Sequence, residues 1–364
     1  MKKTATTIIF AVLLVLNLSC ENKTRAQMIE SRKTLPQFQW EENLNCPPGY
    51  PIEVYRGGLD GNVYVSLSNG TSTGIRGWGA SGAGSSHGLK PLPSRINCIW
   101  VSYAEGCLYS IDSPIDYDKM LQLFQEGYQD SGPFFNGNGE YKKCTYNTII
   151  TGFAPGGVVV IWVMGGGRQV EIGRYQGEKY QVPEEEIARL DAHESLLFSK
   201  KEYKRIMNNI KIVPLEVREA NAGKPIPFGL WDTYRVRYSW KPIFDLKHNE
   251  KIDEIYMGMY NGENEELFDK SLTDSKYFKR GIPKIANIGW KDKDGQNYGG
   301  NIIFDEKEIW NAFEELFKDN KEGQAELQFH INYTGTFITV QIKKGDKEIR
   351  LIKTQVSTFE STLE

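Results

Sequence analysis

Histidine is scarce in this sequence, and the spaced residue pairs that mark common catalytic and metal sites are missing. The four histidines, His87, His193, His248 and His330, lie far apart, and none stands in H-x-x-x-H or H-E-x-x-H spacing, which argues against a zinc hydrolase. The sequence also lacks a C-x-x-C pair, so a thioredoxin-like redox site is not indicated. We therefore expect no metal and no cofactor, and we assign no catalytic residue.

Neither an excess of basic residues nor a long apolar run beyond the N-terminus is present. Lysine and arginine number 44 against 47 acidic residues, which gives a net charge of −3. Binding to the phosphate backbone needs a basic excess, so nucleic acid is not an expected partner. The longest later apolar run, VVVIWVM at 158–164, has the length of a strand rather than of a membrane span.

The first twenty residues carry the clearest signal in the sequence. Two lysines precede an uncharged, largely apolar segment that ends at Ser19, as in an export signal. Because Cys20 follows directly, the segment resembles a bacterial lipoprotein signal, in which the cysteine receives the lipid, palmitate included, and becomes the new N-terminus. Asn17 stands where the stringent pattern has leucine, although signals of the Bacteroidota type are looser there. An ordinary secretory signal is the alternative.

This pattern leads to a prediction of location. We expect a signal peptide at 1–19 and a mature protein that is attached to the membrane through the lipid on Cys20. The protein would lie in the cell envelope, with the outer membrane favoured, and would be exposed to the periplasm or to the surface.

Five cysteines are present, and removing Cys20 leaves an even set of four, Cys46, Cys98, Cys107 and Cys144. In an oxidising compartment, an even set is compatible with disulfides, so these four are candidate disulfide partners. The sequence does not rank the three pairings of four cysteines. Buried free thiols are the alternative.

The length of the chain predicts two domains after the N-terminal signal. Residues 20–35 are polar and without apolar periodicity, which is typical of a tether. We expect a first β-rich lobe with a helical extension at 36–213 and a second β-rich lobe at 231–364. The segment 214–230 combines three prolines and two glycines and is the predicted connection.

Local signals predict an α+β fold with mostly antiparallel strands. Strand-like runs alternate with glycine, proline and asparagine turns. A helix is expected after Ser113 or Asp116, either of which can cap it, and Gly127 can end it. The glycines at 165–167 separate two strand-like runs and indicate a hairpin, while 183–212 forms a connecting helical region.

The second half of the chain repeats the order of motifs of the first half, which predicts two tandem, divergently related lobes, each with a helix. The corresponding segments are QFQWEE at 37–42 with RYSWKP at 237–242, LPSRINCIW at 92–100 with IPKIANIGW at 282–290, and KMLQLFQEG at 119–127 with IWNAFEELFKDN at 309–320. The alternative is that β-rich domains generally contain such tryptophans and glycine turns.

Three blocks of the first lobe, PPGYPIEVYRGGLDG, LKPLPSRINCIWVSYAEGCLYSID and TGFAPGGVVVIWVMGGGRQVEIGRYQ, cover most of residues 36–180. In these blocks the chain resembles the bacterial lipoprotein family filed as domain of unknown function 2931. The resemblance implies an exported, lipid-anchored protein of Gram-negative bacteria and supplies no activity. The second lobe departs from the pattern, since it lacks the Ala-Glu-Gly turn and the Ala-Pro-Gly-Gly element.

The segment GWGASGAGSSHGLK at 77–90 is the candidate binding loop, with Trp78, Ser85, Ser86 and His87 as its candidate residues. A mobile glycine loop without a binding role is the alternative. It does not match a nucleophile elbow, because the spacing of small residues is wrong and no helix follows. It also lacks the lysine-serine ending of a phosphate-binding loop.

These observations favour a non-catalytic binding protein with a protein as its candidate partner. A specific form, by resemblance only, is an immunity lipoprotein that neutralises a secreted toxin. The competing class is a hydrolase that uses Ser85 or Ser86, His87 and an acid such as Glu105, provided that these side chains meet within hydrogen-bond reach.

Overall fold

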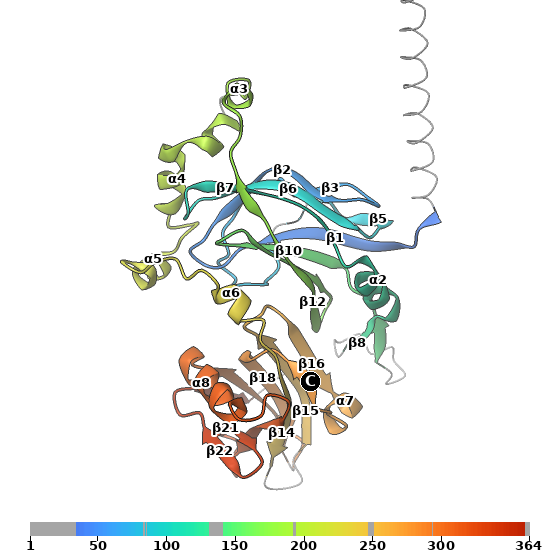
Figure 1. Cartoon of the computed structure of the whole chain (residues 1–364). Coiled ribbons are helices and arrows are strands. Elements are labelled where there is room, and N and C mark those ends of the chain that lie inside the picture. Colours follow the sequence, from blue (N-terminus) through green and yellow to red (C-terminus); the bar gives the residue numbers. More distant parts are fainter. Residues whose placement is uncertain are drawn as a thin grey trace, which may run out of the picture.

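The computed structural model describes residues 34–82, 84, 86–130, 141–191, 194–246, 251–292 and 294–360. The predicted signal peptide, Cys20, most of the tether and Ser85 lie outside the described residues. The described chain forms two β-rich lobes, one above the other in Figure 1, so the predicted α+β class with mostly antiparallel sheets is confirmed. None of the helices within these ranges has the length and apolar character that a membrane crossing requires.

The first lobe has two facing sheets, of which one has the order β13-β7-β6-β2-β3, while the other contains β12-β11-β10-β1-β5. The small pair β8-β9 lies beside them. The strands are β1 (Gln37–Asn45), β2 (Ile52–Asp60), β3 (Val65–Ser66), β4 (Thr71–Ser72), β5 (Gly88–Pro91), β6 (Arg95–Ser102), β7 (Cys107–Pro114), β8 (Tyr128–Asp130), β9 (Lys142–Cys144), β10 (Thr148–Ala154), β11 (Val158–Met164), β12 (Arg168–Gln176) and β13 (Glu178–Tyr180).

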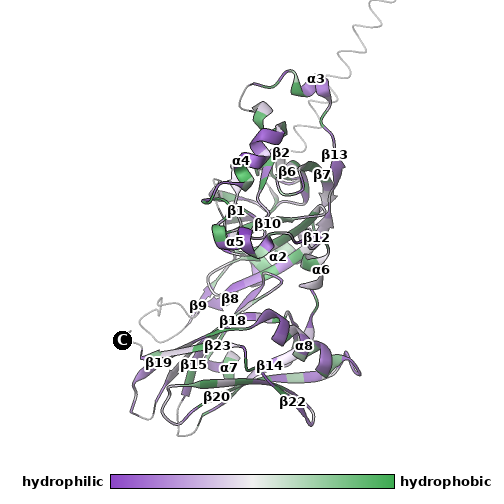
Figure 2. Cartoon of the chain, turned by 90° about the vertical axis from the view of Figure 1, so that its left-hand side faces the viewer, coloured by the Kyte–Doolittle hydropathy of each residue, from purple (hydrophilic) through white to green (hydrophobic). Residues whose placement is uncertain are grey.

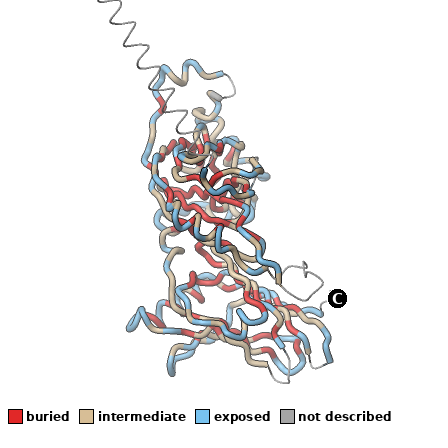
Figure 3. Tube along the Cα trace, turned by 90° about the vertical axis from the view of Figure 1, so that its right-hand side faces the viewer, coloured by how far each residue is buried: buried red, intermediate tan, exposed pale blue. Residues whose placement is uncertain are grey.

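Strand β6 shows how the two faces of a sheet are used. Ile96 and Trp100 point into the core between the two sheets, where they join the inward side chains of β1, β10 and β11. Ile99 and Val101 point the other way and pack with Ile206 of helix α4. This alternation follows the two-residue period of a strand, and both faces of the sheet are therefore covered. Figure 3 shows the buried stretches running through both lobes.

The predicted helix is confirmed as α2 (Tyr117–Glu126). The Asp116 carboxylate accepts a hydrogen bond from the Lys119 N–H, as an N-cap does, and Gly127 ends the helix with a φ of 62°. Met120 and Phe124, one turn apart, are its buried residues. The predicted hairpin is confirmed too, because β11 and β12 pair antiparallel around the glycine turn.

The connecting region consists of short helices rather than one long helix. They are α3 (Glu184–Ile187), the 3-10 helix η1 (Glu194–Phe198), α4 (Lys200–Met207), α5 (Leu215–Asn221) and α6 (Leu230–Thr233). Pro214 directly precedes α5 and Gly229 precedes α6, so the proline-rich connection itself is partly helical. Figure 2 shows hydrophilic and hydrophobic residues side by side along α4 and α5.

The second lobe has its own core, to which helix α8 contributes Ile309, Phe313 and Phe317. Its elements are β14 (Tyr238–Asp245), β15 (Lys251–Met259), β16 (Asn264–Phe268), α7 (Asp269–Thr273), β17 (Phe278–Arg280), β18 (Pro283–Lys291), β19 (Asn297–Ile303), α8 (Glu306–Phe317), β20 (Gln324–Ile331), β21 (Ile338–Lys344), β22 (Lys347–Arg350) and β23 (Gln355–Glu360).

Strand pairing follows the same order in both lobes. The first strand of each lobe pairs in parallel with a strand that lies later in the chain than the main helix, β1 with β10 and β14 with β20. It also pairs antiparallel with a short strand, β5 or β17. The Trp40 indole donates to the Pro91 carbonyl at 3.2 Å, and the Trp240 indole donates to the Gly281 carbonyl at 3.1 Å. The strands β2-β6-β7 and β15-β18-β19 also form equivalent antiparallel series.

The lobes share one ten-stranded sheet, which the sequence did not predict. Strand β12 of the first lobe pairs with β16 of the second, with Arg168 opposite Glu265 and Gln169 opposite Asn264. Two residue pairs make a short ladder, so other contacts must contribute to the joint between the lobes.

The four cysteines of the folded part are free thiols in the structure, so none of the candidate disulfides forms there. Cys98 and Cys107 lie on adjacent strands, but Cys98 faces Ile111 while Cys107 faces Ser102. This offset of four strand residues separates them by about 13 Å, which is too far for a disulfide. Burial raises the pKa of the Cys46 thiol to about 12, which makes it an unreactive core residue.

Candidate functional site

The first part of the candidate loop is held in place by Asn45, a buried residue at the end of β1. Its side-chain oxygen accepts from the Gly79 N–H at 2.8 Å, and its amide nitrogen donates to the Gly77 and Ala80 carbonyls at 3.0 and 2.8 Å. A single amide thus satisfies three backbone groups of the loop. The segment 77–80 is therefore an anchored turn in the structure.

Trp78 connects this turn to the joint between the lobes. Its ring meets Trp162 of β11 edge to face at 5.0 Å between centroids, and the Trp162 indole donates to the Asn261 carbonyl of the second lobe at 3.1 Å. Gly79 lies directly against Gly262, since a Cβ on Gly79 would stand 2.4 Å from the Gly262 Cα. This first part of the loop is therefore packed between the two lobes.

Ser86 and His87 contact Glu42 and Glu41 in the middle of β1, where Glu42 is fully buried. The Ser86 N–H donates to the Glu42 carboxylate at 3.0 Å, and its hydroxyl accepts from the Lys90 ammonium at 2.7 Å. His87 is largely exposed, and its Nδ1 lies 3.8 Å from a Glu41 carboxylate oxygen. These contacts close the loop along the edge of the sheet.

Glu105, the acid named in the hydrolase hypothesis, has hydrogen-bond partners other than Ser86 and His87. Its carboxylate accepts from the Ser102 hydroxyl at 2.8 Å, the Tyr109 hydroxyl at 2.7 Å and the Gly156 N–H at 3.2 Å. Within the described residues, the structure does not join Ser86, His87 and Glu105 into the relay that a serine hydrolase requires. The set of Ser86, His87 and Glu105 therefore does not meet that condition, while Ser85 lies outside the described residues.

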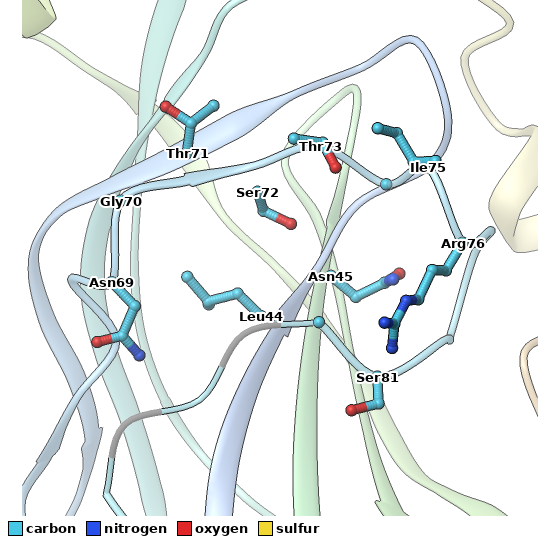
Figure 4. A pocket seen from close by; sticks show the side chains of 12 residues that line it. Leu44, Asn45, Asn69, Gly70, Thr71, Ser72, Thr73, Ile75, Arg76 and Ser81 are labelled. Carbon is cyan, nitrogen blue, oxygen red and sulfur yellow. The ribbon is translucent and has the colours of Figure 1, made fainter. Parts of the chain in front are cut away.

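A hollow of about 490 Å³, here called the β1 hollow, lies between β1 and the segment that precedes the loop. Figure 4 shows Arg76, Asn45 and Ser81 projecting into it from different sides. Its lining residues are Leu44, Asn45, Ser81, Gly82 and the run from Asn69 to Arg76. It combines two apolar side chains, several hydroxyls and one guanidinium.

A second hollow, here called the aromatic cleft, lies where the lobes and the connection meet and has a volume of about 360 Å³. Tyr50 meets Trp231 edge to face at 5.3 Å, and Tyr234 lies 5.4 Å from Tyr260 between ring centroids. The remaining lining residues are Pro47, Pro48, Trp78, Glu216, Val217, Ala220, Asn221, Leu230, Met259, Lys284 and Glu306. Its wall is thus contributed by both lobes and by helices α5 and α6.

A buried ion network holds the other side of the joint. The Arg280 Nε atom lies 2.6 Å from Glu265, and Arg168 of the first lobe lies 3.1 Å from the same carboxylate. Burial raises the pKa of Glu265, but the two guanidinium groups outweigh it and hold this pKa below its usual range. A second network joins Glu171 of β12 to Arg235 at 2.8 Å.

Trp78 was a candidate binding residue on sequence grounds, whereas Arg76 and the residues of the connection were not. No motif marks Arg76, and the aromatic residues at 231–234 directly follow the predicted connection without forming a recognisable motif. As for metals, the part of the chain that the structure describes contains no group of three or more His, Cys, Asp or Glu side chains placed to hold an ion.

Comparison with known proteins identifies the family. The family model described as Protein of unknown function (DUF2931) matches residues 21–229, more than half of the chain, and the chain therefore belongs to this family. The resemblance noted in the sequence is confirmed, and it extends through the connection to the residue before α6. No curated protein and no solved structure matches the chain. The aromatic cleft thus combines residues of the matched region with residues of the second lobe.

Proposed function

We propose that the protein is an exported, lipid-anchored binding protein of the cell envelope, without catalytic activity, and that it binds a protein partner at the aromatic cleft. The signal-like N-terminus that ends at Cys20 and the resemblance to a lipoprotein family support the location. The cleft carries the binding proposal.

The aromatic cleft has the features of a recognition site for an apolar side chain of another protein. Concave sites lined by aromatic residues with a few charged groups are the usual form of a binding pocket, and tyrosine and tryptophan are enriched at binding hot spots. Tyr50, Trp231 and Tyr260 supply the apolar wall, and the exposed Glu216 and Lys284 stand at its rim with opposite charges. A peptide segment that inserts one aromatic or aliphatic residue fits this arrangement.

We also propose that 231–364 is a divergent copy of the first lobe and that the two lobes arose as tandem units joined through 214–230. The shared pairing order, the equivalent Trp40 and Trp240 hydrogen bonds, and the aspartate caps Asp116 and Asp305 of the two main helices support this. The cleft would then be a property of the pair, since neither copy alone supplies its wall. Neutralisation of a toxin is one form of such binding, and the identity of the captured partner would decide it.

The binding proposal predicts that filling the mouth of the cleft blocks capture. Ala220 is exposed on α5 and lines the cleft, so Ala220→Arg places a long charged side chain there without removing a packed group. We expect capture of partners from the native envelope by the immobilised mature chain to fall about tenfold, which is about 1.4 kcal/mol. Capture is measured by quantitative mass spectrometry of the bound proteins.

The matched control is Ala222→Arg, which adds the same side chain to an exposed position just after α5 that does not line the cleft. It should capture the same proteins as the natural chain. Equal capture by Ala220→Arg and Ala222→Arg would refute binding at the cleft. So would the absence of captured protein on the natural chain and on both variants.

The location proposal predicts that Cys20→Ala releases the protein from the membrane. Without the thioether at Cys20 no acyl chain can be attached, and a folded chain then has no lipid to hold it at the bilayer. We expect membrane-fraction protein to become soluble or to remain unprocessed, as measured by fractionation and by mass spectrometry of the N-terminus. The control Cys144→Ala, which removes a thiol from β9, should leave fractionation unchanged. A Cys20 variant that still fractionates with membranes after normal cleavage contradicts the proposal.

A further inference from the structure

The β1 hollow contains one positive charge that the fold leaves unpaired. Arg76 lines the hollow and is exposed, and within the described part of the chain its guanidinium forms no hydrogen bond or ion pair. The residues that line the hollow include no carboxylate. An arginine in this setting can give its fork of N–H donors to an outside anion.

The turn that carries Arg76 is fixed on both sides. The Gly77 N–H donates to the Gly74 carbonyl at 2.8 Å, and Gly77 is in turn bound by the Asn45 amide at 3.0 Å. Gly74 has a φ of 66°, and a Cβ there would stand 2.3 Å from the Cys46 carbonyl oxygen, so only glycine allows this close approach to β1. The backbone of Arg76 is therefore ordered before a ligand arrives, which lowers the entropic cost of binding.

The carboxylates that lie behind the hollow are already bound to neighbouring donors. Glu42 accepts from the Asn69 amide at 3.2 Å and from the loop backbone, while Glu53 accepts from the Thr71 hydroxyl at 2.6 Å and from Tyr103 at 2.9 Å. Neither carboxylate forms an ion pair with Arg76 in the structure. The positive charge remains available on the side that opens into the hollow.

The other residues that line the hollow indicate which groups the ligand has besides its negative charge. Leu44 and Ile75 offer apolar surface, and the Thr73 hydroxyl, which has no partner among the described residues, offers one further hydrogen bond. The volume of about 490 Å³ falls within the range of about 300–1,000 Å³ that small-molecule pockets have. A ligand with an apolar body and one anionic group matches both parts of the wall.

We propose that the β1 hollow binds a small organic anion, with its carboxylate or phosphate group on Arg76 and its apolar body against Leu44 and Ile75. This site is separate from the aromatic cleft and does not depend on the function proposed there. Arg76 supplies the charge-assisted hydrogen bonds that select an anion over a neutral molecule of the same shape.

The test uses the mature chain and four probes in isothermal titration at low, constant ionic strength. Benzoate and phenyl phosphate distinguish carboxylate from phosphate, inorganic phosphate lacks the apolar body, and benzyl alcohol lacks the charge. We expect one of the two aromatic anions to bind at least about tenfold more tightly than benzyl alcohol and than inorganic phosphate.

Variants of the hollow then assign the site. Arg76→Ala should weaken binding of that anion at least about tenfold, and Arg76→Lys should retain part of it, because lysine keeps the charge without the planar fork. Thr73→Asp should weaken anion binding as strongly as Arg76→Ala, because the new carboxylate competes with the ligand for Arg76. The control Arg189→Ala removes another exposed arginine, on a segment that does not line the hollow, and should leave anion binding unchanged.

Three results would overturn the proposal. They are the absence of binding of both aromatic anions to the natural chain, equal binding of benzyl alcohol, and unchanged anion binding in the Arg76→Ala and Thr73→Asp variants. Because Arg76 and Thr73 make no described contacts that hold the fold, circular dichroism should report natural-like melting for both variants.

Discussion

Replacing Trp162 by alanine is expected to lower the free energy of unfolding by about 3–5 kcal/mol. The indole is fully buried in β11, packs edge to face on Trp78 and donates a hydrogen bond to the Asn261 carbonyl of the second lobe. Its loss leaves a cavity and an unsatisfied buried carbonyl at the joint between the lobes. Urea denaturation followed by far-ultraviolet circular dichroism measures the change.

The milder variant Trp162→Phe separates the two contributions. Phenylalanine keeps most of the aromatic packing but removes the N–H, so we expect a loss of about 1–2 kcal/mol. If the joint couples the lobes, the alanine variant should also split the single unfolding transition into two, one for each core. A Trp162→Ala chain that loses less than about 1 kcal/mol and unfolds in one transition would show that this contact does not hold the lobes together.

Elements that depend on neighbouring residues were predictable from the sequence. Helix α2 follows from an aspartate cap, an apolar spacing and a terminal glycine, all within the segment from Asp116 to Gly127. The hairpin of β11 and β12 follows from the glycines between two strand-like runs. In both cases the residues that determine the element lie within one short segment, so the element can be predicted from the sequence of that segment.

The candidate loop shows why the rest was not predictable. Its glycines indicated a mobile, binding or catalytic loop, but position 79 has no room for a side chain because Gly262 of the other lobe lies against it. In the same way, the sequence cannot tell that Arg76 has no partner among the described residues while Arg280 is buried beside Glu265. Such facts depend on which distant segments meet, and pairs such as β12 with β16 are too short to leave a pattern.

The cysteines make the same point about register. An even number in an exported chain suggested disulfides, yet the pairing of β6 with β7 sets Cys98 opposite Ile111 rather than opposite Cys107. A shift of register along one strand pair would change which side chains are neighbours. The number of cysteines therefore shows only that disulfides are possible, and the strand register decides whether two thiols are close enough to form one.

Glu265→Gln is expected to destabilise the protein at neutral pH by about 3 kcal/mol, because it leaves Arg168 and the buried Arg280 without their shared carboxylate. Arg280 has a side chain that is 5% exposed, so water cannot replace the lost partner there. The free energy of unfolding at pH 7, from urea denaturation, measures this change. Glu322→Gln is the control, since its carboxylate is 78% exposed and pairs with Lys279 at the surface. That control should change stability by less than about 0.5 kcal/mol.

The pH dependence distinguishes a charged network from simple packing. The pKa of Glu265 is lower in the folded chain than its usual value of 4.5, so the unfolded chain takes up the proton first as the pH falls. The stabilisation by this carboxylate is therefore fully present above about pH 4.5 and is lost as the pH falls through the folded-state pKa. Glutamine has no such titration, so the difference in stability between the natural chain and Glu265→Gln should narrow steadily below about pH 4.5. If the difference in the free energy of unfolding between the two chains stays constant from neutral to acid pH, the charge of Glu265 does not contribute to the joint and only its packing does.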